Sequence, residues 1–574
     1  MSLTVSTELV AATEGVALQS YRQHAQQMRG DREIEIDTTR LDEAGLTSII
    51  GAAGVIGDTK TARAAESILL ARSGRFDKPV PNFKAFKGVL EAFLKSNLLD
   101  GWIYVTEDDG KLYPQLVTGV SYDDGMNYGR NKGTPSVRIH ATAYGFSHDG
   151  NYKMRLGIFQ TSHSFAPQSV ANRRIADILA AEGLYKESPA LKDAHVASLE
   201  RHRRITEDGF AKQFRVNGAV LHFEDENYGR RGMELLNHRV IHDLEPKDYG
   251  PVSQHAESDL FDADASAHGV GTVPEHPVVR VFDLRTHEFF WVHGDNMRAH
   301  EYEKSLRDKL VLPPSHRDLL DVLTTDLGAF VDDFIEGKSA GNVILCKGIP
   351  GVGKTLTAEV YAELIERPLY AIHSGSLGTT AQDIEKNLSA IFQRGKRWDC
   401  VLLLDEADVF VVQRGNNIEQ NAIVAEFLRT LEYFDGLLFM TTNRPHDIDE
   451  AIISRCAAII DYAAPSPDDA AEIWRVMSNQ YKAGVDQELI AGLVDLFPEI
   501  APRDIKMLFR LALRVASAHK EALSLDTFRR CAMFRAIKIK ARDADAPMPN
   551  SIRQCKNGHD QLRIHQVHAA SAGV

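Results

Sequence analysis

Eight residues in the second half of the chain have the types and spacing that a phosphate-binding loop requires. Gly348 is followed after four residues by Gly353, Lys354 and Thr355, and Gly351 lies between them. Glycines let several N–H groups point at one anion, and a helix that starts after the loop adds partial positive charge. We therefore predict a nucleoside triphosphate site. Its predicted loop residues are Gly348, Pro350, Gly351, Val352, Gly353, Lys354, Thr355 and Leu356.

Two adjacent carboxylates follow the apolar run 401–404, about 50 residues after the loop. A buried strand would bring Asp405 and Glu406 to the edge where open α/β sheets bind ligands. We predict that Asp405 and the hydroxyl of Thr355 hold Mg²⁺. Glu406 can orient and deprotonate an attacking water molecule.

Three further polar residues extend this constellation. Asn443 ends the apolar stretch that starts near Leu437, so its amide is predicted to hold the same water molecule near the γ-phosphate. Arg455, in Ser-Arg-Cys, can present its guanidinium to the γ-phosphate of a neighbouring subunit. Arg503, in Ala-Pro-Arg, could reach the nucleotide of its own chain, but an ordinary surface arginine fits the sequence equally well.

The second half of the chain has the alternating pattern of an α/β fold. Helical segments separate five short apolar runs, which predicts a parallel sheet covered on both faces. Beyond Pro465 the spacing of apolar residues is helical only, and from about Asp543 the sequence is polar and irregular, which predicts a disordered tail over 543–574. The predicted strands are 343–346, 369–373, 401–404, 437–441 and 458–461.

The first 300 residues show no catalytic constellation. Residues 1–95 are predicted to be mainly helical and residues 96–300 to form an α+β domain that recognises a partner or substrate. The residues around 148–151 indicate a hairpin, and residues 214–223 suggest a strand pair. Residues 245–276, rich in Pro, Gly, Asp, Ser and His, indicate an exposed loop or linker.

Length and composition set the outer limits. At 574 residues the chain should form several domains, and its net charge of −14 argues against a general nucleic-acid coat protein. The sequence contains no run of about 18 apolar residues, so we expect no membrane span. The N-terminus lacks the layout of a secretory signal, and the five cysteines form no CxxC pair. We expect a cytoplasmic protein with reduced thiols.

In order and spacing, these pieces resemble the AAA+ ATPases. The segments around Lys354, Asp405, Asn443, Arg455 and Arg503 look like the family's Walker A, Walker B, sensor 1, arginine finger and sensor 2. The resemblance covers roughly residues 310–540. It implies a large ATPase subdomain over 301–464 with a helical lid over 465–542. It further implies ATP with Mg²⁺ at each interface of a homo-oligomeric ring, commonly of six subunits.

Three functions fit this resemblance. The favoured hypothesis is a ring that hydrolyses ATP to remodel a protein client, which the first 300 residues select. One alternative is a nucleic-acid-acting ATPase, either a loader or a translocase, which the acidic charge makes less favourable. The other is a scaffold whose assembly is timed by nucleotide. Residues 374–382, before the helix that leads to Asp405, lack the aromatic residue of protein-threading relatives, so threading of a client is doubtful.

Overall fold

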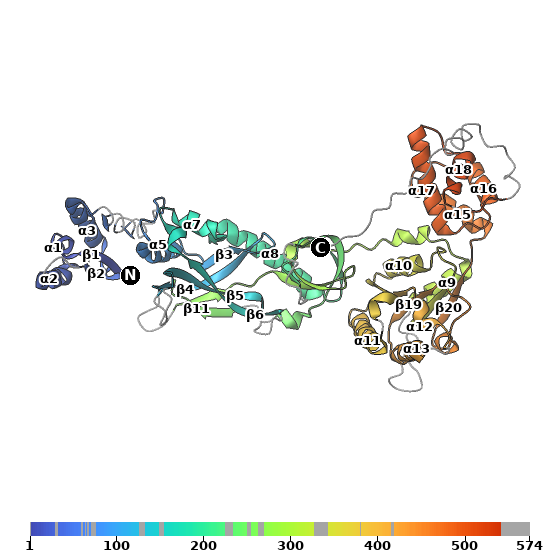
Figure 1. Ribbon diagram of the computed structural model, residues 1–574, viewed down its shortest axis with the longest axis horizontal. Helices are drawn as coiled ribbons and strands as arrows, with labels where there is room; N and C mark the ends of the chain where they lie inside the picture. Colours follow the sequence, from blue (N-terminus) through green and yellow to red (C-terminus); the bar gives the residue numbers. More distant parts are fainter. Residues whose placement is uncertain are drawn as a thin grey trace, which may run out of the picture. The chain divides into compact units, whose positions relative to one another are not determined.

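The computed structural model divides the chain into two compact units, residues 1–301 and 302–574 (Figure 1). In the described residues, no helix is both long and apolar enough to cross a membrane. The predicted tail, residues 543–574, lies wholly outside them. The structure describes residues 2–28, 33–58, 61–62, 65, 68–69, 76–125, 133–148, 154–223, 233–249, 254–261, 269–325, 342–378, 380–414, 418–535 and 537–540.

The first unit begins with a strand pair and short helices around a small core. Residues 33–37, Glu-Ile-Glu-Ile-Asp, alternate polar and apolar side chains, so Ile34 and Ile36 are buried while the two glutamates are exposed. Asp42 caps the longest of the helices described here by accepting a hydrogen bond from the N–H of Gly45. The prediction of a mainly helical start did not include this strand pair. The elements are β1 (Ser2–Ser6), α1 (Thr7–Ala11), α2 (Gln19–Gln27), β2 (Glu33–Asp37) and α3 (Glu43–Ile56).

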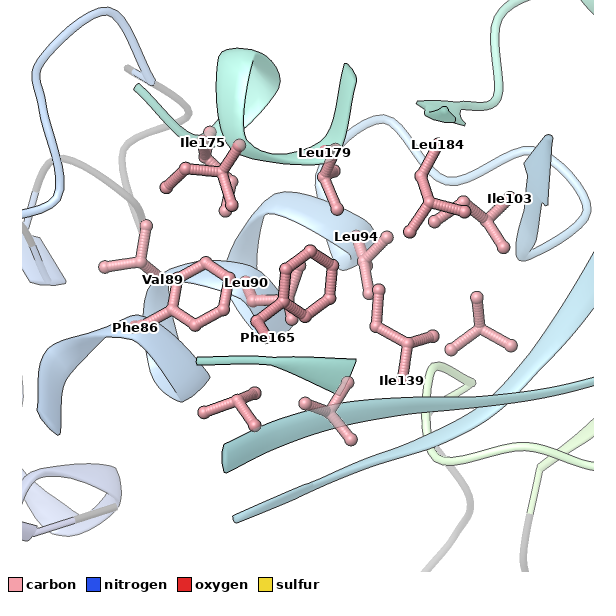
Figure 2. Packing of buried hydrophobic residues seen from close by; sticks show 14 of the residues in the cluster. Phe86, Val89, Leu90, Leu94, Ile103, Ile139, Phe165, Ile175, Leu179 and Leu184 are labelled. Atoms are coloured by element: carbon pink, nitrogen blue, oxygen red, sulfur yellow. The ribbon is translucent and has the colours of Figure 1, made fainter. Parts of the chain in front are cut away.

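A five-stranded antiparallel sheet follows, in the order β6-β5-β4-β3-β7. Figure 2 shows Phe86 and Leu90 of one helix beside Phe165 of the sheet and Leu94 of the same helix near Ile139, with Leu179 of a second helix above them. The predicted hairpin is present as the paired β5 and β6, and its turn lies outside the described residues. The elements are α5 (Phe83–Lys95), β3 (Trp102–Thr106), β4 (Leu112–Asp123), β5 (Ser136–His148), β6 (Met154–Phe165), α6 (Pro167–Val170), α7 (Ile175–Ala181) and β7 (Leu184–Lys186).

The same unit contains a six-stranded sheet, in the order β15-β8-β10-β13-β14-β9, and the separate ribbon β11-β12. Two predictions were wrong here. Residues 214–223 do not pair with each other, because Phe223 pairs with Phe290 instead. Residues 245–276 contain the ribbon, because Val270–Val273 alternates exposed and buried side chains. The elements are α8 (Pro189–Asp208), β8 (Gln213–Ala219), β9 (His222–Phe223), β10 (Glu234–His242), β11 (Gln254–Glu257), β12 (Val270–Val273), β13 (Val278–Asp283), β14 (Phe289–His293) and β15 (Met297–Ala299).

The second unit contains the predicted parallel sheet, in the order β17-β18-β19-β16-β20. All six residues of β19 are buried, so both of its faces are covered. The predicted α/β fold with a P-loop NTPase sheet is therefore confirmed. The elements are α9 (Pro314–Thr325), β16 (Asn342–Gly348), α10 (Lys354–Leu364), β17 (Leu369–His373), α11 (Ala381–Arg397), β18 (Val401–Asp405), α12 (Asp408–Val411), α13 (Ile418–Leu431), β19 (Leu437–Thr442), α14 (Glu450–Ile453) and β20 (Ala458–Tyr462).

Four helices gather into a separate small bundle after the sheet (Figure 1). Their core surrounds Trp474, whose ring centroid lies 5.5 Å from that of Phe528 and 6.0 Å from that of Phe509. Such aromatic contacts between helices hold the bundle as one packed body. The helices are α15 (Pro467–Gln480), α16 (Gln487–Leu496), α17 (Pro502–His519) and α18 (Leu525–Met533).

Candidate nucleotide-binding site

The glycine-rich loop leaves β16 and enters α10 in a conformation that needs its glycines. Gly348, Gly351 and Gly353 have φ angles of 144°, 85° and 107°, which residues with side chains rarely adopt. A Cβ atom at Gly348 would lie 2.2 Å from the carbonyl oxygen of Tyr462 on β20. Pro350 and Leu356 are exposed and Val352 is buried. Strand β20 therefore fixes the path of the loop from behind.

Lys354, the first residue of α10, joins this loop to the end of β19. Its buried ammonium group donates to the carbonyl oxygens of Gly348 and Ile349, both at 2.8 Å, and to Oδ1 of Asn443 at 2.9 Å. Burial lowers the pKa of Lys354, whereas the nearby carboxylate of Asp408 raises it. The structure thus brings two of the predicted residues, 89 positions apart, into direct contact.

The predicted metal ligands are also adjacent. The hydroxyl of Thr355 donates to Oδ1 of Asp405 at 2.8 Å. A hydroxyl and a carboxylate at this separation are hard oxygen donors, and one Mg²⁺ ion with its water shell could take both as ligands. The residues present therefore fit the ion.

A residue that the sequence reading missed holds both acids. The hydroxyl of Thr441 on β19 donates to Oδ1 of Asp405 at 2.6 Å and accepts from the N–H of Glu406 at 3.0 Å. Glu406 has a φ of 54°, unusual for a residue with a side chain, and its side chain is exposed. Thr441 thus holds the strand end at the point where the backbone turns Glu406 towards solvent.

A second missed residue, Asp408, holds Asn443. Its Oδ1 accepts from the hydroxyl of Thr442 at 2.5 Å and from the N–H of Asn443 at 3.0 Å. Asp408 lies only three residues after Asp405, and Thr442 directly precedes Asn443. Their polar character at the ends of two buried strands was the available signal.

Arg503 lies beside the loop of its own chain. Its N–H, at the start of α17, donates to the carbonyl oxygen of Gly351 at 3.0 Å. A Cβ atom at Gly351 would lie 3.0 Å from the Cβ atom of Arg503. The positive charge of Arg503 also acts on Lys354, whose pKa it lowers. The helical bundle thus contacts the loop through this residue.

Arg455 is not part of this network. Its guanidinium donates to the carbonyl oxygen of Ala451 at 3.2 Å and pairs with Glu432 at 3.6 Å. Its exposed fraction is 33%. Within the described part of the chain, no hydrogen bond or ion pair joins Arg455 to the loop. Four of the five predicted parts of the site therefore lie together, and the segment of Arg455 is the exception.

The fold and the loop define a P-loop nucleotide-binding protein. Residues 344–463 match the model of the ATPase family associated with various cellular activities (AAA). These residues therefore form an AAA domain, as the sequence resemblance predicted for this part of the chain.

Curated relatives share parts of the chain. An uncharacterised AAA family ATPase, y4kL, of Sinorhizobium fredii is 30% identical over 25% of this chain and 44% of its own length. The human ATPase family gene 2 protein homolog B is 27% identical over 38% of this chain and 29% of its own. Fidgetin-like protein 1 of Drosophila melanogaster is 23% identical over 46% of this chain and 50% of its own. The chain thus spans half or less of these relatives.

Solved structures show low global similarity. A crystal structure of the FIGL-1 AAA domain in complex with ADP is 18% identical, with a TM-score of 0.33, over 43% of this chain and 87% of that one. A HORMA:CdnC:Trip13 complex of E. coli MS115-1 contains a chain that is 20% identical, with a TM-score of 0.34, over 41% of this chain and 92% of that one.

Proposed function

We propose that this protein binds ATP with Mg²⁺ and hydrolyses it at the interfaces of a homo-oligomeric ring. One observation carries the proposal: direct hydrogen bonds join Lys354 to Asn443 and Thr355 to Asp405 at one edge of the sheet. Thr441 holds Asp405 and Glu406 there, and Asp408 holds Asn443. A lysine with a glycine loop, an oxygen-rich cation site, a carboxylate and an amide are the parts that phosphoryl transfer to water needs.

Each residue has a distinct task in this reaction. The loop N–H groups and the Lys354 ammonium bind the β- and γ-phosphates of ATP. Thr355 and Asp405 would hold Mg²⁺, whose charge offsets that of the phosphate oxygens. The carboxylate of Glu406 accepts the proton of the attacking water molecule, and the amide of Asn443 orients that molecule.

Arg455 gives the physical reason for a ring. Among the described residues it has no hydrogen bond or ion pair with the loop of its own chain, and its role would be to act on the γ-phosphate of a neighbouring subunit. A guanidinium supplied in this way stabilises the negative charge of the transition state. The site is then complete only at an interface between subunits. A ring of six subunits is what the resemblance to the family implies.

A mixing experiment tests this arrangement. Glu406→Gln and Arg455→Ala each abolish ATP hydrolysis alone, and a mixture of the two proteins recovers part of it. Recovery is expected because an intact Glu406 in one subunit can face an intact Arg455 from the next. Arg475→Ala, an exposed arginine on α15, serves as the matched control and retains full turnover.

Two results would overturn the proposal. Normal hydrolysis by Arg455→Ala would remove Arg455 from the reaction. A mixture that assembles, as shown by analytical ultracentrifugation, but recovers no turnover would exclude donation between subunits.

The residues before 302 are proposed to select a protein client that the ring remodels. Stimulation of ATP hydrolysis by a protein that co-purifies with Glu406→Gln supports this proposal. Stimulation by DNA or RNA would instead support a loader or translocase. Turnover that neither ligand changes would support the scaffold.

A further inference from the structure

Two arginine side chains of the first unit meet at a single neutral oxygen. Nη1 of Arg215 on β8 and Nη2 of Arg298 on β15 both donate to Oδ1 of Asn237, at 3.3 and 3.0 Å. Asn237 lies on β10 with a φ of 56°, where the register with β8 shifts. This irregularity turns the amide of Asn237 towards both guanidinium groups.

A third arginine continues the same row. The strand register places Arg298 directly opposite Arg215, and Arg215 directly opposite Arg239. Residues opposite one another in neighbouring strands share a face of the sheet, and like charges there destabilise it. The reverse face carries the core residues Phe214, Val216 and Val240. Arg215, Arg239 and Arg298 therefore share the face of these strands that is not the core.

Two of the arginines, Arg215 and Arg298, are held in place by hydrogen bonds within the protein. Nε of Arg215 donates to Nδ1 of the buried His300 at 3.2 Å, so its guanidinium has a fixed direction. Asn237 restricts Arg298 in the same way. Fixed side chains lose less conformational entropy on binding, and a guanidinium fork matches the two oxygens of a carboxylate.

An exposed leucine adjoins the row. Leu236, the neighbour of Asn237 in the register shift, has 67% of its surface exposed. The combination of fixed guanidinium groups with an aliphatic contact fits an acidic peptide that also carries apolar side chains. A single-stranded nucleic acid would instead be matched by aromatic side chains for its bases.

We propose that this face, formed by Arg215, Arg298, Arg239, Asn237 and Leu236, binds an acidic, leucine-containing segment of a protein partner. Its identification as the client's docking site rests on the proposed remodelling function. The binding step needs neither ATP nor hydrolysis. It can therefore succeed or fail independently of the ATPase.

The full-length protein is titrated into a fluorescein-labelled peptide of glutamate and leucine, and anisotropy is measured. The peptide binds the wild type, and its Kd rises by about tenfold or more in Arg215→Gln/Arg298→Gln, because charge-assisted hydrogen bonds are lost. Arg203→Gln/Arg204→Gln removes the same charge from the exposed face of α8 and leaves the Kd unchanged. Glu406→Gln also leaves it unchanged, which separates docking from hydrolysis.

Several outcomes would overturn the proposal. The double variant and its control could weaken binding equally, which would indicate a general charge effect. A peptide with glutamine in place of glutamate could bind as tightly, or an oligonucleotide of equal net charge could bind more tightly; either result would also overturn the proposal.

A second variant, Arg298→Glu, changes an exposed position of the outer strand. It should prevent peptide binding while circular dichroism shows an unchanged fold, and normal binding by this variant would contradict the proposal.

Discussion

The two units bury their polar side chains in different ways. In the second unit, Lys354, Thr441 and Thr442 are buried and belong to one network at the end of the parallel sheet. In the first unit, buried histidines are spread through the interior, on or beside α8, β10, β13 and β14. Five of them are His195, His202, His242, His276 and His293, and a sixth, His300, follows β15.

The histidines pack largely as neutral aromatic rings. The ring centroid of Tyr113 lies 4.9 Å from that of His276 and 5.4 Å from that of His293, and Trp102 lies 5.6 Å from His195. Burial lowers the pKa of His195 to about 3 and those of His202, His242, His276 and His293 to about 4. The second unit thus places a group of buried polar side chains at the proposed nucleotide site, whereas these five histidines of the first unit are part of its packed interior.

The largest expected effect is the loss of the first unit's fold in acid. Below the ordinary histidine pKa of 6.5, the unfolded chain takes up protons that the folded unit excludes down to about 4. Stability is therefore full above pH 6.5 and falls as the pH decreases towards 4. The loss is about 1.4 kcal/mol per pH unit for each histidine. Hydrogen exchange with mass spectrometry should show peptides of α8 and β13 losing protection first.

His195→Phe serves as the internal check. Nε2 of His195 is buried and has no hydrogen-bond partner among the described residues, so phenylalanine can replace the ring without losing a hydrogen bond seen there. The pH dependence of unfolding should become shallower by one proton. An unchanged slope would mean that His195 is not among the groups that destabilise the unit in acid.

The second largest effect is expected on ATP turnover when Glu406 is replaced. Glu406→Gln should lower ATP turnover by about 10²–10⁴-fold, because a positioned general base contributes that much. ATP binding should persist, since the loop and Lys354 are unchanged. Protection of the first unit should not change either. Glu488→Gln, exposed on α16, is the matched control. Substantial turnover in Glu406→Gln would show that another group accepts the proton.

Thr441 should have a smaller effect on the same reaction. Thr441→Val keeps the shape of the side chain but removes both hydrogen bonds to the acids, so kcat should fall by about tenfold or more. The KM for ATP should change little, because the loop does not depend on Thr441. Thr441→Ser retains the hydroxyl and should restore kcat. A fall in stability without a change in kcat would reduce Thr441 to a structural role.

The polar network of the second unit could be predicted from the sequence, whereas the buried histidine contacts of the first unit could not. Asp405 ends one short apolar strand, Asn443 directly follows another, and Lys354 follows a third after the glycine-rich loop. Parallel strands bring their carboxyl ends to one edge of the sheet. Those positions were predictable. Tyr113, His276 and His293 meet only because two antiparallel sheets and their connections pack together, and no local spacing indicates that. Thr441 and Asp408 fall between these cases, since their position was evident but their partners were not.

The smallest effect expected is at the contact between the helical bundle and the loop. The backbone of Arg503 is fixed to Gly351, but its side chain is exposed, so solvent screens its charge. Arg503→Gln should therefore weaken ATP binding only about threefold to tenfold and leave the fold unchanged. Arg510→Gln, an exposed arginine on the same helix, should bind a fluorescent ATP analogue as the wild type does. Equal affinities for both variants would make Arg503 an ordinary surface residue, and the bundle would then contact the loop through its backbone alone.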